Sequence, residues 1–303
     1  MKKVFSYLKE TYQEWINDEA FRQSAVIAYY SIFSIPGLII IVVNVAGLFY
    51  EQAKIEGKIS SQISEYIGSE SAEQVQSIVA NSTQEGNFTI AFIVGIATLI
   101  FGATGLFYQL QLSLNKVWEV ELKPDSGIKK LVLDRATSLG LILAIGFLLI
   151  VSLLLSTALG ILKGWISQVV PDFLMYIFII ANELLSIGII TVLFALIYKV
   201  LPDVYLTWKT VWVGAFVTAL LFTLGKFALG FYFSQSDPAS AFGAAGSLIL
   251  ILLWVNYSGL IFLFGAEFTQ VYARKNNHPV KISSHAQRTA DYKLKQERVT
   301  AGE

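Results

Sequence analysis

The chain of 303 residues contains no cysteine and few charged residues. Without cysteine it can form neither disulfides nor thiolate metal sites, and a cysteine nucleophile is excluded. Its two histidines, His278 and His285, lie in a polar C-terminal stretch without acidic partners at the spacing of a metal site. The P-loop, HExxH and GxSxG patterns are also missing. We therefore expect a protein that is not an enzyme and that carries neither a metal nor a cofactor.

Positively and negatively charged residues are equal in number. The 22 basic and 22 acidic side chains give a formal net charge of zero, so no overall field would attract nucleic acid. Charged residues make up only 15% of the chain and hydrophobic residues 55%, with a mean hydropathy of +0.61. These values lie outside the range of soluble domains. The expected partners are membrane lipids and a small-molecule or lipid substrate of unknown identity, with a homo-oligomer left open and nucleic acid excluded.

Six long apolar stretches dominate the sequence. A bilayer core about 30 Å thick needs roughly 20 mostly apolar helical residues, and helices satisfy their own backbone groups in lipid. The sequence therefore predicts an all-α, polytopic membrane protein with six transmembrane helices. The spans are expected at Ser24 to Tyr50, Phe88 to Asn115, Val132 to Gly164, Phe173 to Val200, Trp208 to Phe233 and Phe242 to Tyr272.

Lysine and arginine are distributed unevenly between the two ends of these spans. Eighteen of the 22 lie in or beside the N-terminal segment, the second and fourth connections and the C-terminal tail. Lys54, Lys58 and Lys163 lie on the opposite side, and Lys226 lies inside a helix. Cytoplasmic segments carry the excess of positive charge. Both termini of this multi-pass membrane protein are therefore predicted to be cytoplasmic.

Three segments outside or between the spans have their own patterns, around a transmembrane domain of residues 24–272. Residues 1–23 form an amphipathic helix that either lies in the cytoplasmic membrane interface or packs on the bundle. Residues 51–87 are expected to form short extracytoplasmic helices that act as a lid or packing element, or that recognise a partner. Residues 273–303 are a polar cytoplasmic tail, expected to be disordered or loosely helical. The apolar face of the N-terminal helix contains Phe5, Leu8, Tyr12, Trp15 and Ile16.

Charged residues inside spans are costly in lipid and therefore informative. Glu183 and Lys226 are expected at similar depth, roughly 14 to 17 Å from the outer surface, where they could pair. Asn182, Asn44 and Asn256 could extend this polar core. One interpretation is a substrate-binding or gating site. The other is structural contact between helices, with Lys226 reaching outward to water.

A second polar group is expected at the cytoplasmic ends of the spans. It contains Asn115, Asp134, Arg135 and Glu267. Most of these side chains could be interface anchors. Glu267 differs because it lies on an apolar helix well before Arg274, and it could pair with Arg135 across the bundle.

The first span contains Pro36 and Gly37 near its middle. Proline removes a helical hydrogen bond and glycine adds conformational freedom, so we expect a kink or break there. Such a hinge would suit a transporter, although many membrane kinks are only structural.

Four sequence segments together resemble one known family. They are AYYSIFSIPGL at 28–38, GLFYQLQLSLNKVW at 105–118, ALIYKVLPD at 195–203 and SAFGAAGSLILILLWVNYSGLIFLFGAEF at 240–268. This combination resembles the YihY/BrkB family, formerly mislabelled ribonuclease BN. Phe242 stands where the family pattern favours tyrosine, and Asn256 where it often has an aromatic residue.

The resemblance implies a six-helix bacterial inner-membrane protein without an established substrate. Three functions follow as hypotheses. The first is a secondary transporter or a translocase for lipids or amphiphiles. The second is a non-transporting envelope-integrity or scaffold protein. The third is a membrane-tethered nuclease, which the residues do not favour because nothing in the sequence could hold a catalytic metal on RNA.

Overall fold

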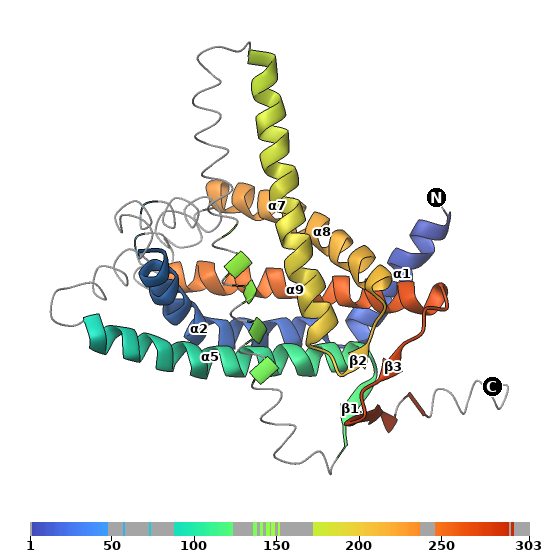
Figure 1. Ribbon diagram of the computed structural model, residues 1–303. Helices are drawn as coiled ribbons and strands as arrows, with labels where there is room; N and C mark the ends of the chain where they lie inside the picture. Colours follow the sequence, from blue (N-terminus) through green and yellow to red (C-terminus); the bar gives the residue numbers. More distant parts are fainter. Residues whose placement is uncertain are drawn as a thin grey trace.

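The computed structural model describes residues 2–47, 88–123, 172–236 and 246–290, together with positions 57, 73, 136–137, 140–141, 144–145, 147–148, 151 and 292–293. These residues are mostly helical, and Figure 1 shows several long helices running alongside one another, while the helix of residues 172–200 crosses them steeply and projects away from them. The helices are α1 (Lys2–Asn17), α2 (Ala20–Gly47), α5 (Phe88–Val117), α7 (Asp172–Val200), α8 (Trp208–Ser236) and α9 (Gly246–Lys275).

Five of these helices match predicted spans closely, and α1 matches the predicted N-terminal amphipathic helix. The third predicted span falls largely outside the described residues, as does the 51–87 connection apart from Gly57 and Glu73. Within the described residues, three segments are long and apolar enough to cross a bilayer: Ile180–Val200, Trp208–Tyr232 and Leu248–Lys275. The fold is that of an all-α membrane protein.

Helices α8 and α9 approach each other closely at small residues. A methyl group added at Gly214 would collide with Thr269, and one added at Gly265 would collide with Thr218. Glycine at these positions allows the two backbones to come close together, as is common between membrane helices. Tyr198 of α7, 1% exposed, completes the contact, because its hydroxyl donates to the Phe262 carbonyl at 2.7 Å and lies 3.1 Å from the Thr218 hydroxyl.

Helix α2 is held between α5 and α9 in the same way. A methyl group at Gly102 of α5 would lie 2.6 Å from the backbone of Phe33, and one at Gly259 of α9 would lie 3.1 Å from Ser24. The Ser24 hydroxyl donates to the side-chain oxygen of Asn256 at 2.9 Å. Helix α2 is continuous through Pro36 and Gly37, so the helix does not break there, and the alternative of a kink stays a prediction. The side chains of 35–47 are outside the described part, and the hinge stays a prediction.

Helix α1 packs on α9 by one face and leaves an apolar stripe uncovered. The indole nitrogen of Trp15 donates to the Leu260 carbonyl at 3.1 Å, and the ring of Tyr7 lies 6.3 Å from that of Phe268. The uncovered stripe contains Phe5, Leu8, Tyr12 and Ile16. The alternative of packing on the bundle is therefore seen at Trp15 and Tyr7, whereas insertion of the uncovered apolar face into the membrane interface stays a prediction.

Two pairs of short strands tie the tail to one end of the bundle. Strand β1 (Val120–Leu122) pairs with β4 (Ala286–Arg288), and β2 (Val204–Tyr205) pairs with β3 (Lys281–Ile282), both antiparallel. The expectation of a disordered or loosely helical tail is wrong for residues 276–290. Backbone pairing with segments that follow α5 and α7 orders this polar stretch despite its low apolar content.

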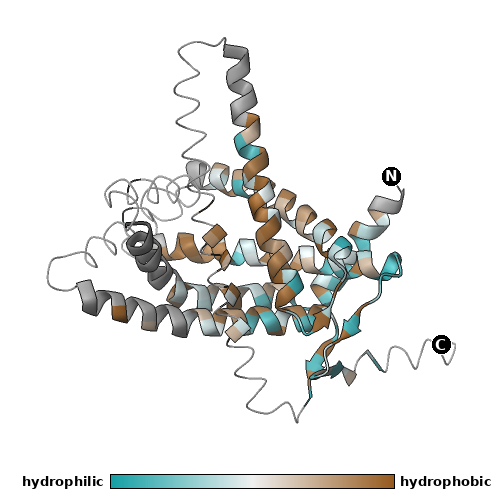
Figure 2. Cartoon of the chain, in the orientation of Figure 1, coloured by the Kyte–Doolittle hydropathy of each residue, from teal (hydrophilic) through white to brown (hydrophobic). Residues whose placement is uncertain are grey.

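The end of α9 directs the chain into this arrangement. Asn277 has φ of 53°, and the His278 amide donates to the Ala273 carbonyl at 2.9 Å while the Asn277 amide donates to Arg274. This is the hydrogen-bonding pattern of a left-handed helix cap, a conformation that asparagine tolerates well. Figure 2 shows hydrophilic residues gathered at this end of the molecule, whereas hydrophobic residues dominate along α7 and α8.

Candidate functional site

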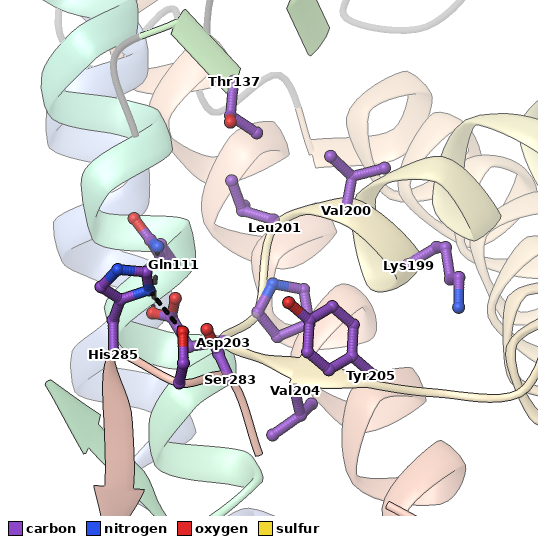
Figure 3. A pocket seen from close by; sticks show the side chains of 12 residues that line it. Gln111, Thr137, Lys199, Val200, Leu201, Asp203, Val204, Tyr205, Ser283 and His285 are labelled. Carbon is purple, nitrogen blue, oxygen red and sulfur yellow. Dashed lines mark hydrogen bonds between the residues drawn. The ribbon is translucent and has the colours of Figure 1, made fainter. Parts of the chain in front are cut away.

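Two cavities are found among the described residues at the polar end of the bundle, and residues of the tail line both of them. The smaller, of about 210 Å³, lies between the end of α5, the turn after α7 and the tail at Ser283 to His285. Figure 3 shows Gln111, Asp203 and His285 around it. The larger, of about 630 Å³, lies between α1, the end of α5, the end of α9 and the segment near Arg288.

Asp203 organises the smaller cavity. Its side chain is 5% exposed and accepts hydrogen bonds from the amide groups of Asn115 at 2.8 Å and Gln111 at 3.1 Å. The Asp203 amide donates back to Asn115 at 2.8 Å, and the Ser283 amide donates to the Asp203 carbonyl at 3.0 Å. A carboxylate satisfied by fixed amide donors is stabilised in its place. Asp203 therefore joins α5, the α7–α8 turn and the tail.

An ionic seam connects α1 with the end of α9. Arg274 contacts Glu10 at 2.5 Å and Glu14 at 3.3 Å, and Lys275 contacts Glu10 at 2.5 Å. Burial acts to raise the pKa of Glu10, but the hydrogen bonds and positive charges of Lys275 and Arg274 outweigh it and hold this pKa below its ordinary value. The N-terminal helix is thus fixed to the last turn of α9.

Glu267 lies deeper in the same seam, about two turns before Arg274 on α9. It is 1% exposed, and neither of its carboxyl oxygens has a hydrogen-bond partner among the described residues. Of the charged groups that act on it, the carboxyl group of Asp18, the residue after α1, has the largest effect, ahead of Glu14 and Arg274. Burial raises the pKa of Asp18, although Glu267 and the Lys116 ammonium act in the opposite direction.

The larger cavity opens beside these acids. Glu14, Gln270 and Arg274 line its inner wall, and the side-chain oxygen of Gln270 is also buried without a partner among the described atoms. The cavity is also lined by Arg288, whose guanidinium donates to the Trp118 carbonyl at 2.7 Å and lies over the ring of Tyr292. Within the described part of the chain, no cluster of three metal-binding side chains is found.

The outer polar core predicted from sequence is not assembled as expected. No ion pair joins Glu183 to Lys226, both of which are described and half-buried. The Lys226 ammonium lies 5.0 Å from the ring centroid of Phe227. Asn182 contributes its carbonyl to Ser186 within its own helix, Asn256 bonds Ser24, and the side chain of Asn44 is outside the described part.

The inner polar group is assembled in part, with different partners. Asn115 pairs with Asp203, and Glu267 faces Asp18. Asp134 and Arg135 lie outside the described residues, so the proposed Arg135 contact with Glu267 stays a prediction. Sequence reasoning missed Asp18 and Asp203 as site residues. The signal available for each was its position in the chain: Asp18 directly follows α1, and Asp203 lies three residues after α7.

Comparison with known proteins agrees with this architecture. The family model described as virulence factor BrkB matches residues 11–290. The chain therefore belongs to the BrkB family. The segments that bear the Asp203 and Glu267 contacts all lie within the matched range.

The chain is also similar to several proteins named UPF0761 membrane protein. One from Pseudoalteromonas translucida is 24% identical over 91% of this chain and 91% of its own length. One from Saccharophagus degradans is 25% identical over 87% of this chain but 59% of its own length, and one from Tolumonas auensis is 30% identical over 58% and 56%. The chain thus spans less than two thirds of some of its relatives. No solved structure matches.

Proposed function

We propose that this chain is a non-enzymatic, multi-pass protein of the bacterial inner membrane that moves a polar or amphiphilic solute, such as a lipid, across that membrane. The observation that carries the proposal is Glu267. Its carboxyl group is fully buried, has no hydrogen-bond partner among the described residues and lies in the 28-residue apolar segment Leu248–Lys275. Ionisable groups inside membrane helices are costly, and by default they indicate a transport or proton pathway.

The meeting of polar segments at one end supports the proposed topology of six spans with both termini in the cytoplasm. The N-terminal helix contacts the last turn of α9 through Glu10 and Arg274. The segments after α5 and α7 pair with the tail through β1 and β2. These are the four regions in which lysine and arginine accumulate, and the cytoplasmic side is where this excess belongs.

The two cavities lie at the polar end of the bundle. The proposed transport path is therefore nearer the cytoplasmic side than the path expected from sequence. Neither cavity is lined by Glu183, Lys226 or Asn256. The larger one is lined by Gln270 and Arg274 of α9, one and two turns beyond Glu267. It combines arginine, histidine and amide groups with aromatic surfaces, which are groups that bind the polar head of an amphiphile.

A scaffold function is the second candidate, favoured by the order of the tail. The strand pairs and the Asp203 hydrogen bonds hold residues 281–288 on the end of the bundle. A fixed cytoplasmic surface of this kind could present a binding face to another envelope protein. This candidate requires no buried acid, and therefore predicts that Glu267→Gln is harmless wherever the protein folds.

The test begins with an unbiased comparison of lipids and metabolites in a deletion strain and an overexpression strain. Transport predicts at least one chemical class that changes in opposite directions in the two strains. Purified protein in liposomes should then move that class across the bilayer, whereas protein-free liposomes should not. If no class responds in either strain, and the deletion's envelope defects are restored by any folded variant, the scaffold function replaces transport.

A further inference from the structure

We propose that Glu267 and Asp18 form a proton-binding site, in which one proton is held between two carboxyl groups from α9 and the end of α1. The proposal goes beyond transport of a solute. It rests on the proposed function only for the use to which the proton is put, since the site itself can be measured without any substrate.

Among the described residues, no hydrogen-bond donor reaches Glu267. The residue is 1% exposed, and both oxygens are unpartnered among the described atoms. An ionised carboxylate buried without a hydrogen bond or a counter-charge is costly enough that the group normally takes up a proton instead. The side chain that faces it is Asp18, which offers only acceptors when ionised. A proton on either group creates the missing donor.

The basic side chains near the pair already bind other groups. The Lys116 ammonium donates to the backbone carbonyl of Asp18 and to the Glu19 carboxylate, each at 2.9 Å. Arg274 is bound by Glu10 and Glu14. Across the described residues, no ammonium or guanidinium is recorded within ion-pair distance of Glu267 or Asp18. Within the described part of the chain, which does not include Arg135, the pair therefore has no direct counter-ion that would let both groups ionise.

Charged groups from several packed elements surround the pair. Among the described residues, those with the largest effect on it are Glu14 on α1, Lys116 on α5, Glu119 just after α5 and Arg274 on α9. Two of these groups are acidic and two are basic, so their formal charges sum to zero. Repulsion between two close carboxylates then favours retention of one proton, and the two groups titrate as a unit.

The larger cavity gives a proton a path toward the pair. Glu14 and Arg274, which flank the pair, also line the 630 Å³ cavity. Asp18 lies in the connection between α1 and α2, at the polar end of the bundle. A proton could therefore reach the pair from the cytoplasmic side of the proposed topology, while Glu267 places it within the apolar part of α9.

Infrared spectroscopy of the purified full chain tests the site directly. At neutral pH, the wild-type protein should show the carbonyl band of a protonated, buried carboxylic acid. The band should disappear in Glu267→Gln and should weaken or shift in Asp18→Asn. The matched control is Glu10→Gln, which removes an acid from the same seam whose pKa is held low by Lys275 and Arg274, and the band should persist in it.

Thermal unfolding provides the second readout. A shared proton stabilises the folded state while it is bound, so wild-type stability should fall as pH rises through the pKa of the pair, and this slope should be lost in Glu267→Gln. Absence of the protonated band in wild type would overturn the proposal. So would a band that both variants retain, or one that sodium ions abolish at constant pH, which would indicate a cation site instead. None of these outcomes depends on whether a solute is transported.

Discussion

Replacing Gly265 with alanine should destabilise the contact between α7, α8 and α9. The added methyl group would lie 2.7 Å from the Tyr198 hydroxyl oxygen and 2.8 Å from Thr218 Cβ, and closer still to the Thr218 hydroxyl. Overpacking of this kind costs about 1–3 kcal/mol. Weakening a hydroxyl hydrogen bond costs roughly 0.5–1.5 kcal/mol more, against a gain of about 0.5–1 kcal/mol from replacing a helical glycine.

The expected net loss in the free energy of unfolding is about 1–3 kcal/mol. Thermal unfolding of the detergent-solubilised protein, followed by tryptophan fluorescence, measures it. Gly188→Ala is the matched control on α7, because no described atom lies within 4 Å of its new methyl group, and it should unfold at or above the wild-type temperature. Adding Thr218→Ala to Gly265→Ala should recover part of the loss. A monodisperse Gly265→Ala protein as stable as wild type would refute the close approach of α8 and α9.

Three further predictions concern the polar end and the topology. Asp203→Ala should lower the free energy of unfolding by about 1–3 kcal/mol, because buried donors such as the Asn115 amide lose their acceptor, and it should make the tail more sensitive to limited proteolysis. Wild type should be more stable than Glu10→Gln above pH 4.5, the ordinary pKa of glutamate. This difference should vanish as pH falls further, because the pKa of Glu10 is lowered by ion pairs that require an ionised Glu10. A constant difference down to acidic pH would contradict the prediction. Reporter fusions at Lys123 should give a cytoplasmic signal and those near Glu65 an external one, and a reversed pattern would overturn the orientation.

The helices were predictable from sequence because their signal is strong and local. An apolar run of more than 20 residues has few alternatives in a membrane protein, and the predicted start of α8 at Trp208 and end of α7 at Val200 coincide with the observed bounds. The resemblance to the BrkB family, based on four short segments, is confirmed by the match over residues 11–290.

The site was predictable only where one residue is unusual by itself. Glu267 could be singled out because an acid on an apolar helix is rare. Asp18 and Asp203 could not, since an acid at a helix end is the ordinary case and its partners depend on how distant helices pack. Glu183 and Lys226 form no direct ion pair, since equal depth does not fix the rotation of two helices about their axes. The ordered structure of the C-terminal tail was not predicted, because pairing between backbone groups leaves little trace in amino-acid composition.

The most direct test of the proposed transport is whether Glu267→Gln restores the wild-type lipid and metabolite profile to the deletion strain. The comparison is made at matched membrane abundance with Glu183→Gln, which makes the same change on α7, outside both cavities. We predict that Glu183→Gln restores the profile and that Glu267→Gln, although folded, does not. Full restoration by Glu267→Gln would contradict the account, because a buried acid that can be neutralised without effect has no part in transport.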